Sequence, residues 1–141
     1  NWPVLRYSDV LLMLAESINE ASGPNAEAYD YLNQVRKRAG LAALDGLSKD
    51  AFRTAVLKER RVELAFENHR WFDLQRTNTP TQLAAFMNAH GAQEKASPTV
   101  ARGGIAFNAL DYQYSDFEYY LPIPAPQILI NKNLAQNPGY N

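Results

Sequence analysis

The stretch from Lys58 to Leu74 mixes charged residues with large apolar ones and contains neither glycine nor proline. This pattern predicts an uninterrupted helix that carries charge on the same side as its apolar residues. With 3.6 residues per turn, one side of the helix holds these residues: Phe52, Val56, Glu59, Glu63, Phe66 and Arg70. Glutamates four residues apart repel each other unless cations lie beside them. Burying such charges is costly, so the pattern indicates a half-buried ion network between packed helices.

The predicted ion network joins glutamates of this stretch to nearby arginines, and its members are Glu59, Arg60, Glu63, Arg36 and Arg70. Carboxylates that lie among arginines have lowered pKa values, which suit structural pairing and not a protonated general acid. We therefore interpret the network as structural. We expect Glu63→Ala to destabilise the protein by about 2 to 4 kcal/mol, because it would strand a buried arginine.

Length and composition favour a single globular domain over residues 1–141. A chain of 141 residues with 46% hydrophobic residues can bury a sizeable core. A net charge of -1 gives no basis for binding nucleic acid. The longest strictly apolar run, Val10 to Ala15, is far shorter than the roughly 20 residues of a membrane-spanning helix. There is no initiator methionine and no signal-like segment at the start, so we expect the chain to be a piece of a longer protein.

The apolar periodicity predicts an all-α fold. A first helix over residues 6–22 is apolar around more than half of its surface, and a second follows over residues 25–40. The short link between them predicts an antiparallel hairpin of the kind that stacks in tetratricopeptide arrays. A long third helix, capped by Ser48, is expected over residues 49–76. These helices form the predicted scaffold, residues 1–76.

The remainder of the chain is expected to be less regular. Residues 77–119 form a predicted variable loop region, with one short helix over residues 80–89 that turns Leu83, Phe86 and Met87 inward. Residues 120–141 form a predicted extended tail, because Pro122, Pro124 and Pro126 restrict the backbone.

Catalytic and metal-binding signatures are weak in this sequence. Its two histidines, His69 and His90, lack the spacing of a metal-binding pair, and there is no cysteine. No serine lies in a nucleophile elbow, and no glycine-rich loop is long enough to hold a phosphate. A glycoside hydrolase fragment that uses two of the carboxylates remains a weak alternative. We expect a protein that is not an enzyme and has no catalytic residue, metal or cofactor.

Two groups of aromatic residues could bind a ligand. Trp71 and Phe72 could stack on a sugar ring, but we favour a packing role for them because they end a charge-rich helix. Tyr112 and Tyr114 alternate with polar residues, which suits stacking and hydrogen bonding to a carbohydrate or a peptide. These two tyrosines are the predicted ligand-binding residues, with ordinary half-buried tyrosines as the alternative.

Four sequence blocks, in order, resemble the C-terminal part of the SusD/RagB family of outer-membrane nutrient-binding lipoproteins. The blocks are RYSDVLLMLAE (residues 6–16), LNQVRKRAG (32–40), ERRVELAFE running into RWFDL (59–74), and LPIP (121–124) with QNPGY (136–140). Two departures are small. Ser8-Asp9 stands where alanine and glutamate are usual, and Asn68-His69 where glycine and a variable residue are usual. Residues 77–119 carry no family signature.

The resemblance implies an all-α protein on the outer surface of the outer membrane. Members attach to the membrane through a lipidated N-terminal cysteine, which is absent from this chain. They work with a SusC-like TonB-dependent transporter and bind glycans or peptides through variable loops. The matched motifs are scaffold residues in the family, so no binding residue can be transferred. The main alternative is a helical-repeat scaffold that binds a protein partner and no small ligand.

Overall fold

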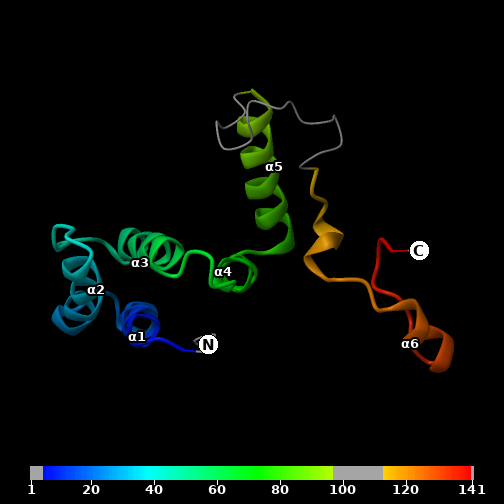
Figure 1. Ribbon diagram of the computed structural model, residues 1–141, viewed down its shortest axis with the longest axis horizontal. Coiled ribbons are helices and arrows are strands. Elements are labelled where there is room, and N and C mark those ends of the chain that lie inside the picture. Colours follow the sequence, from blue (N-terminus) through cyan, green and yellow to red (C-terminus); the bar gives the residue numbers. More distant parts are fainter. Residues whose placement is uncertain (1–4, 97–112, 141) are drawn as a thin grey trace. The chain divides into compact units, whose positions relative to one another are not determined.

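The computed structural model describes residues 5–96 and 113–140, and the regular structure in these ranges is entirely helical (Figure 1). This confirms the all-α prediction. The chain divides into two compact units, Asn1–Asp73 and Leu74–Asn141, which we call the first and the second unit.

The first unit is built on a hairpin of α1 (Tyr7–Ser22) and α2 (Ala26–Arg38), followed by α3 (Lys49–Glu63). Gly23 ends α1 with φ +86°, and the side chain of Asn25 caps α2 by accepting a hydrogen bond from the Ala28 N–H at 2.9 Å. α1 packs against both α2 and α3, which explains why it is apolar on two sides (Figure 1).

The core of the first unit contains eight buried residues: Leu11, Leu12, Ala15, Ala28, Leu32, Val35, Phe52 and Val56. Tyr29 packs edge-on against Phe52, with ring centroids 4.9 Å apart, and its hydroxyl accepts a hydrogen bond from the Leu47 N–H at 2.6 Å. The side chain of Asn33 pairs with both backbone groups of Leu44, at 2.9 and 3.0 Å. These two contacts fix the loop between α2 and α3, so α3 enters the core at a defined position.

The long third helix expected over residues 49–76 is two helices, and that prediction was wrong. α3 ends at Glu63, and α4 (His69–Thr77) begins after a turn over residues 64–68. Phe66 and Asn68 adopt the left-handed backbone conformation, with φ of +66° and +64°. Asparagine tolerates that conformation, whereas a bulky side chain rarely adopts it. The break takes Phe66 off the predicted face, and its side chain is 99% exposed.

The second unit contains a longer helix than the sequence predicted. α5 runs from Pro80 to Ala96 instead of ending near Ala89, and Gly91 is buried within it. The side chain of Gln82 accepts a hydrogen bond from the Thr79 N–H at 2.9 Å, and Thr79 caps Gln82 in return. Leu83 is fully buried as expected, but Phe86 is 42% exposed. Part of the predicted variable loop region is therefore regular helix.

The C-terminal tail folds back on the segment that precedes it. A 3-10 turn, η2 (Asp116–Tyr119), is followed by an extended stretch and by α6 (Ala125–Ile130). The Gln136 side chain bonds both the N–H and the C=O of Ile123, at 2.8 and 2.9 Å. Tyr140 packs edge-on against Phe117, with ring centroids 5.1 Å apart. Side-chain amides and one aromatic pair thus close the tail into a loop.

We predict that Gly139→Ala destabilises the tail more than Gly23→Ala destabilises the hairpin. Both glycines have positive φ, +91° and +86°. A Cβ at Gly139 would lie 2.3 Å from Cγ of Phe117, whereas a Cβ at Gly23 would meet nothing within 4 Å. We expect losses of about 2 to 4 kcal/mol for Gly139→Ala and about 1 kcal/mol for Gly23→Ala in urea unfolding. Equal losses would show that the Phe117 ring moves aside without cost.

Candidate functional site

A buried guanidinium connects three helices of the first unit. Arg60 on α3 contacts Asp9 of α1 at 2.6 Å and Asp73 of α4 at 3.0 Å. All three side chains are about 5% exposed. Because one guanidinium contacts both carboxylates, Arg60 holds α1 and α4 against the C-terminal half of α3.

A second set of ion pairs links α2 and α3 to the residue that precedes α1. Arg36 contacts Glu59 at 2.8 Å and donates a second hydrogen bond to the Ala42 carbonyl at 2.9 Å. Glu63 pairs with Arg38, and also with Arg6 at 3.2 Å. These contacts tie the hairpin to α3.

Arg6 clamps the turn that separates α3 from α4. It donates to the Glu63 carbonyl oxygen at 2.7 Å and meets the Glu67 carboxylate through Nη2 at 2.8 Å and Nε at 2.9 Å. The hydrogen bond that Arg6 donates to Glu67 is the main cause that raises the pKa of Arg6, against an opposing effect of burial. The arginine therefore bonds both ends of the turn.

The structure brings four of the five predicted network residues into ion pairs: Glu59, Arg60, Glu63 and Arg36. Arg70 is half-buried; burial lowers the pKa of its guanidinium, Arg61 lowers it further, and Asp73 acts in the opposite direction. Asp9 and Asp73 also belong to the network, although the charge pattern of residues 58–74 did not predict it. Asp9 could have been recognised, because a charged residue in the apolar stretch of α1 indicates that a buried partner is needed.

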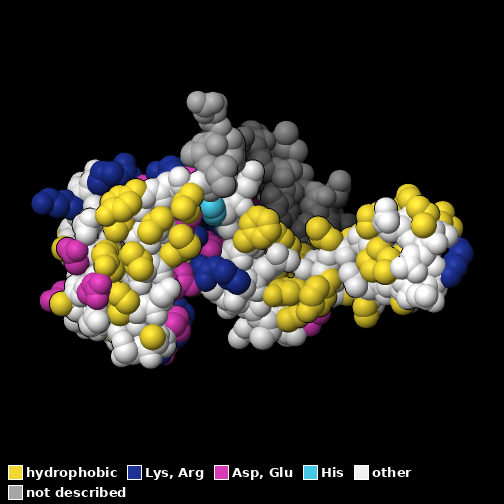
Figure 2. All heavy atoms as spheres, turned by 90° about the horizontal axis from the view of Figure 1, so that it is seen from below, with side chains coloured by type: hydrophobic (Ala, Val, Ile, Leu, Met, Phe, Trp, Pro, Cys, Tyr) yellow, Lys and Arg dark blue, Asp and Glu magenta, His cyan; other side chains and the backbone are white. Residues whose placement is uncertain are grey.

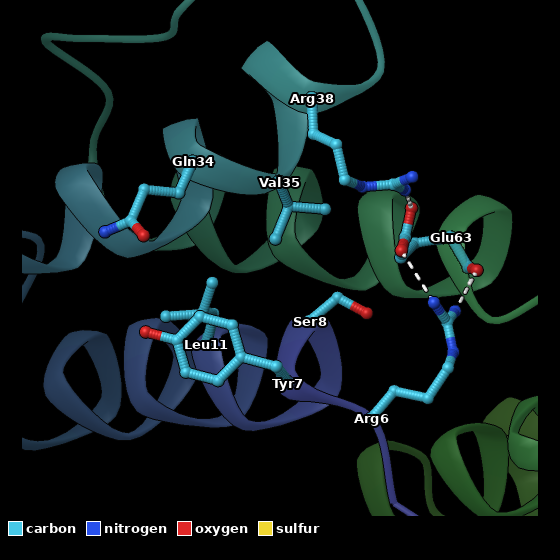
Figure 3. Close-up of a pocket in the computed structure, with 8 residues that line it drawn as sticks. All are labelled: Arg6, Tyr7, Ser8, Leu11, Gln34, Val35, Arg38 and Glu63. Atoms are coloured by element: carbon cyan, nitrogen blue, oxygen red, sulfur yellow. Dashed lines mark hydrogen bonds and ion pairs between the residues drawn. The ribbon is translucent and has the colours of Figure 1, made fainter. Parts of the chain in front are cut away.

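A cavity of about 540 Å³ opens beside these ion pairs (Figure 3). Its lining residues are Arg6, Tyr7, Ser8, Leu11, Gln34, Val35, Arg38 and Glu63. Figure 3 shows Arg38 of α2 and Arg6 reaching Glu63 from opposite sides. Since these charges already bind one another, the cavity offers a ligand mainly the exposed ring of Tyr7 and the Gln34 side chain.

A smaller cavity of about 400 Å³ lies in the second unit, beside the predicted ligand-binding residue Tyr114. Lys95, Gln113 and Ser115 also line it. The side chain of Asn88 on α5 pairs with both the N–H and the C=O of Tyr114, each at 2.8 Å, and so fixes the backbone there. Burial raises the pKa of the Tyr114 hydroxyl. Tyr112, the other predicted residue, lies outside the described residues.

Among residues 5–96 and 113–140, no group of three or more His, Asp or Glu side chains is placed to hold a metal ion. Within the same ranges, no helix has both the length and the apolar character that crossing a bilayer would require.

Residues 1–140 match the model of the SusD family, which includes RagB. The chain belongs to the SusD family. Among curated relatives, SusD-like protein P2 of Formosa agariphila is 32% identical over 99% of this chain and 26% of its own length. SusD-like protein P25 of the same organism is 48% identical over 52% of this chain. The chain thus spans about a quarter of the length of the P2 relative.

Solved structures of SusD proteins share this fold. A SusD superfamily protein from Parabacteroides distasonis matches with a TM-score of 0.72 and 33% identity, over 99% of this chain and 27% of that one. A SusD homolog from Bacteroides thetaiotaomicron matches with a TM-score of 0.68 and 33% identity, over 99% and 27% of the two chains.

The first three SusD-like blocks of the sequence supply the ion network of the first unit. The paired residues in these blocks are Arg6, Asp9, Arg36, Arg38, Glu59, Arg60, Glu63, Glu67 and Asp73. In this chain, the residues that carry the family resemblance therefore make the contacts that hold α1 to α4 together.

We predict that Arg60→Met destabilises the protein by about 3 to 5 kcal/mol, because it removes the guanidinium that pairs with two buried carboxylates, Asp9 and Asp73. The matched control is Arg53→Met, whose exposed pair with Glu20 at 2.5 Å is worth about 1 kcal/mol or less. The measurement is urea unfolding of both variants beside wild type. A loss below that of the control would contradict the structural role of Arg60.

The structure also revises the expected effect of Glu63→Ala. The arginines that would lose the Glu63 carboxylate, Arg6 and Arg38, are 32% and 64% exposed and can be solvated, and Arg6 keeps its contact with Glu67. We therefore expect Glu63→Ala to cost less than Arg60→Met in the same measurement, since Arg60 is the buried cation.

Proposed function

We propose that this chain is the C-terminal part of a longer, non-catalytic protein that binds an oligosaccharide at the outer surface of the outer membrane. The bound nutrient would pass to a SusC-like TonB-dependent transporter. The observation that carries this proposal is the match to the SusD family over residues 1–140. The relatives are about four times longer, which supports placing the chain within a larger protein.

The ion network supports a binding role over a hydrolytic one. Glycoside hydrolysis needs one carboxylic acid that can donate a proton and a second carboxylate across an open site. Glu59, Glu63 and Asp73, which could have supplied this pair, each contact an arginine and have nearly buried side chains. Each of these carboxylates accepts a hydrogen bond from an arginine, so the three groups suit structural pairing.

The cavity beside Tyr114 is the proposed ligand contact within this chain. A tyrosine ring can stack on the apolar face of a sugar, and the nearby Gln113 and Lys95 side chains can donate hydrogen bonds to hydroxyl groups. The two hydrogen bonds between the Asn88 side chain and the Tyr114 backbone hold that backbone before any ligand arrives. Such preorganisation lowers the entropic cost of binding.

A protein-binding scaffold is the second candidate function, and exposed apolar residues of α1 favour it. Tyr7, Met13 and Leu14 are 73%, 41% and 41% exposed. Figure 2 shows hydrophobic side chains gathered on one face of the unit that contains α1 to α3. A scaffold of this kind would bind a protein and no small ligand.

The test is a binding screen on the full-length protein with soluble α-glucan, β-glucan and xylan oligosaccharides and with unstructured peptides. We predict that Tyr114→Ala weakens the affinity for the bound oligosaccharide about tenfold, which corresponds to the roughly 1.4 kcal/mol of a stacked ring. Tyr112→Ala tests the companion residue in the same way. Isothermal titration calorimetry provides the affinities.

Two control variants make this experiment specific. Tyr114→Phe keeps the ring and should retain most of the affinity, and Tyr120→Ala removes an exposed tyrosine that does not line the cavity. Unchanged affinity in Tyr114→Ala would contradict the proposed contact. If the protein binds only peptides, its ligand is a peptide and not an oligosaccharide. If it binds a protein and no small ligand, the result favours the protein-binding scaffold.

A further inference from the structure

The hydroxyl group of Ser8 is a buried polar group that lies at the cavity between α1 and α2. Its oxygen atom makes no hydrogen bond within the part of the chain that the structure describes. The Ser8 side chain lines the cavity of about 540 Å³ from the α1 side (Figure 3). Buried polar atoms in native proteins nearly always have a hydrogen-bond partner, so this hydroxyl indicates that a molecule in the cavity bonds it.

The helix itself does not need this hydroxyl. Ser8 stands in the first SusD-like block at a position where alanine is usual. An alanine there would keep the helix and would leave no buried polar atom without a partner. A ligand therefore explains the hydroxyl better than the fold does.

The cavity combines an apolar floor with one accessible aromatic ring. Leu11 and Val35, which line it, are only 5% and 2% exposed. Tyr7 is 73% exposed, and Figure 3 shows it at the opposite end of the cavity from Glu63. An accessible tyrosine ring beside polar groups suits a ligand that has one apolar face and several hydroxyl groups.

Two further side chains of the cavity provide a donor and an acceptor. Arg38 is 64% exposed, and its guanidinium has N–H groups beyond the one that bonds Glu63. Gln34 donates to Asp30 through Nε2 at 2.8 Å, and its carbonyl oxygen is an acceptor for a ligand hydroxyl.

The ion pairs at the cavity balance one another. Arg6 contacts both Glu63 and Glu67, and Arg38 contacts Glu63, so two cations meet two carboxylates. Such a set gives little attraction to an ion of either sign, which favours a neutral ligand. The volume of about 540 Å³ lies within the roughly 300 to 1,000 Å³ that is typical of small-ligand sites.

We propose that this cavity is a second carbohydrate-binding site, in which a neutral sugar ring stacks on Tyr7 and a sugar hydroxyl bonds Ser8. Sugar hydroxyls both donate and accept, so they also match the Arg38 N–H groups and the Gln34 carbonyl oxygen. The inference rests on the proposed function only for the class of ligand. It uses a different cavity in a different unit and does not depend on Tyr114.

The first experiment replaces Tyr7 with 3-fluorotyrosine in the full-length protein and follows its fluorine NMR signal. The probes are maltotriose, cellotriose and xylotriose, and the protein also carries Tyr114→Ala to weaken the cavity of the second unit. We expect one trisaccharide to shift the signal until it saturates. 3-Fluorotyrosine in place of Tyr29 is the control and should not shift, because Tyr29 packs against Phe52 and does not line the cavity.

The outcomes separate this site from the one at Tyr114. A signal at position 7 that no trisaccharide shifts, or equal shifts at positions 7 and 29, would overturn the second site. A shift caused only by an unstructured peptide would overturn its carbohydrate ligand. A saturating shift at position 7 supports the second site even if Tyr114→Ala leaves the affinity measured by calorimetry unchanged, a result that would contradict only the Tyr114 contact.

The second experiment repeats the titration with Ser8→Ala. We expect the Kd of the trisaccharide to rise about fivefold, because one hydrogen bond is lost. The thermal unfolding midpoint should not fall, since the hydroxyl bonds no group of the described chain. Ser22→Ala is the matched control on α1, because Ser22 bonds the Ile18 carbonyl and does not line the cavity. A Kd for Ser8→Ala equal to that of the control would overturn the proposal.

Discussion

The ion pairs of Arg60 with Asp9 and Asp73 are the contacts on which the arrangement of the first unit depends. Apolar packing alone defines the contact of α1 with α2 and α3, but it does not define where α4 begins after the turn. A buried cation between two carboxylates sets both positions, because each carboxylate must stay within reach of the same guanidinium. Removing Arg60 would take away the guanidinium that both buried carboxylates share, so the network selects the arrangement of the helices that keeps all three groups together.

Much of the first unit could be predicted from its sequence. The apolar periodicity located α1, α2 and the start of α3, and the charge pattern indicated that Glu59, Arg60 and Glu63 would need partners. The break after Glu63 could not be found in this way, because helix propensity and periodicity say little about a left-handed turn built by tertiary contacts. The one local signal was Asn68, which stands where glycine is usual and which adopts the left-handed conformation that glycine favours.

The second unit was harder to predict because its contacts join distant residues. Asn88 and Tyr114 are 26 positions apart, and a reciprocal amide contact between them leaves no periodic trace in the sequence. His90-Gly91 looked like the end of a helix, yet Gly91 is buried within α5, where packing compensates for its weak helix propensity. Tyr114 could be singled out because it alternates with polar residues. The cavity beside it could not be predicted from the sequence.

The clamp between Gln136 and Ile123 has a consequence for the chemical durability of the tail. Ile123 lies between two prolines, which have no N–H, so its amide is the one backbone donor of the Pro122-Ile123-Pro124 triplet. A single glutamine side chain satisfies that donor and the adjacent acceptor together. Slow deamidation of Gln136 would turn the nitrogen that faces the Ile123 carbonyl into an oxygen, and the two acceptors would then repel. Deamidation of Gln136 would therefore weaken one of the contacts that close the tail, and the contact between Phe117 and Tyr140 would remain.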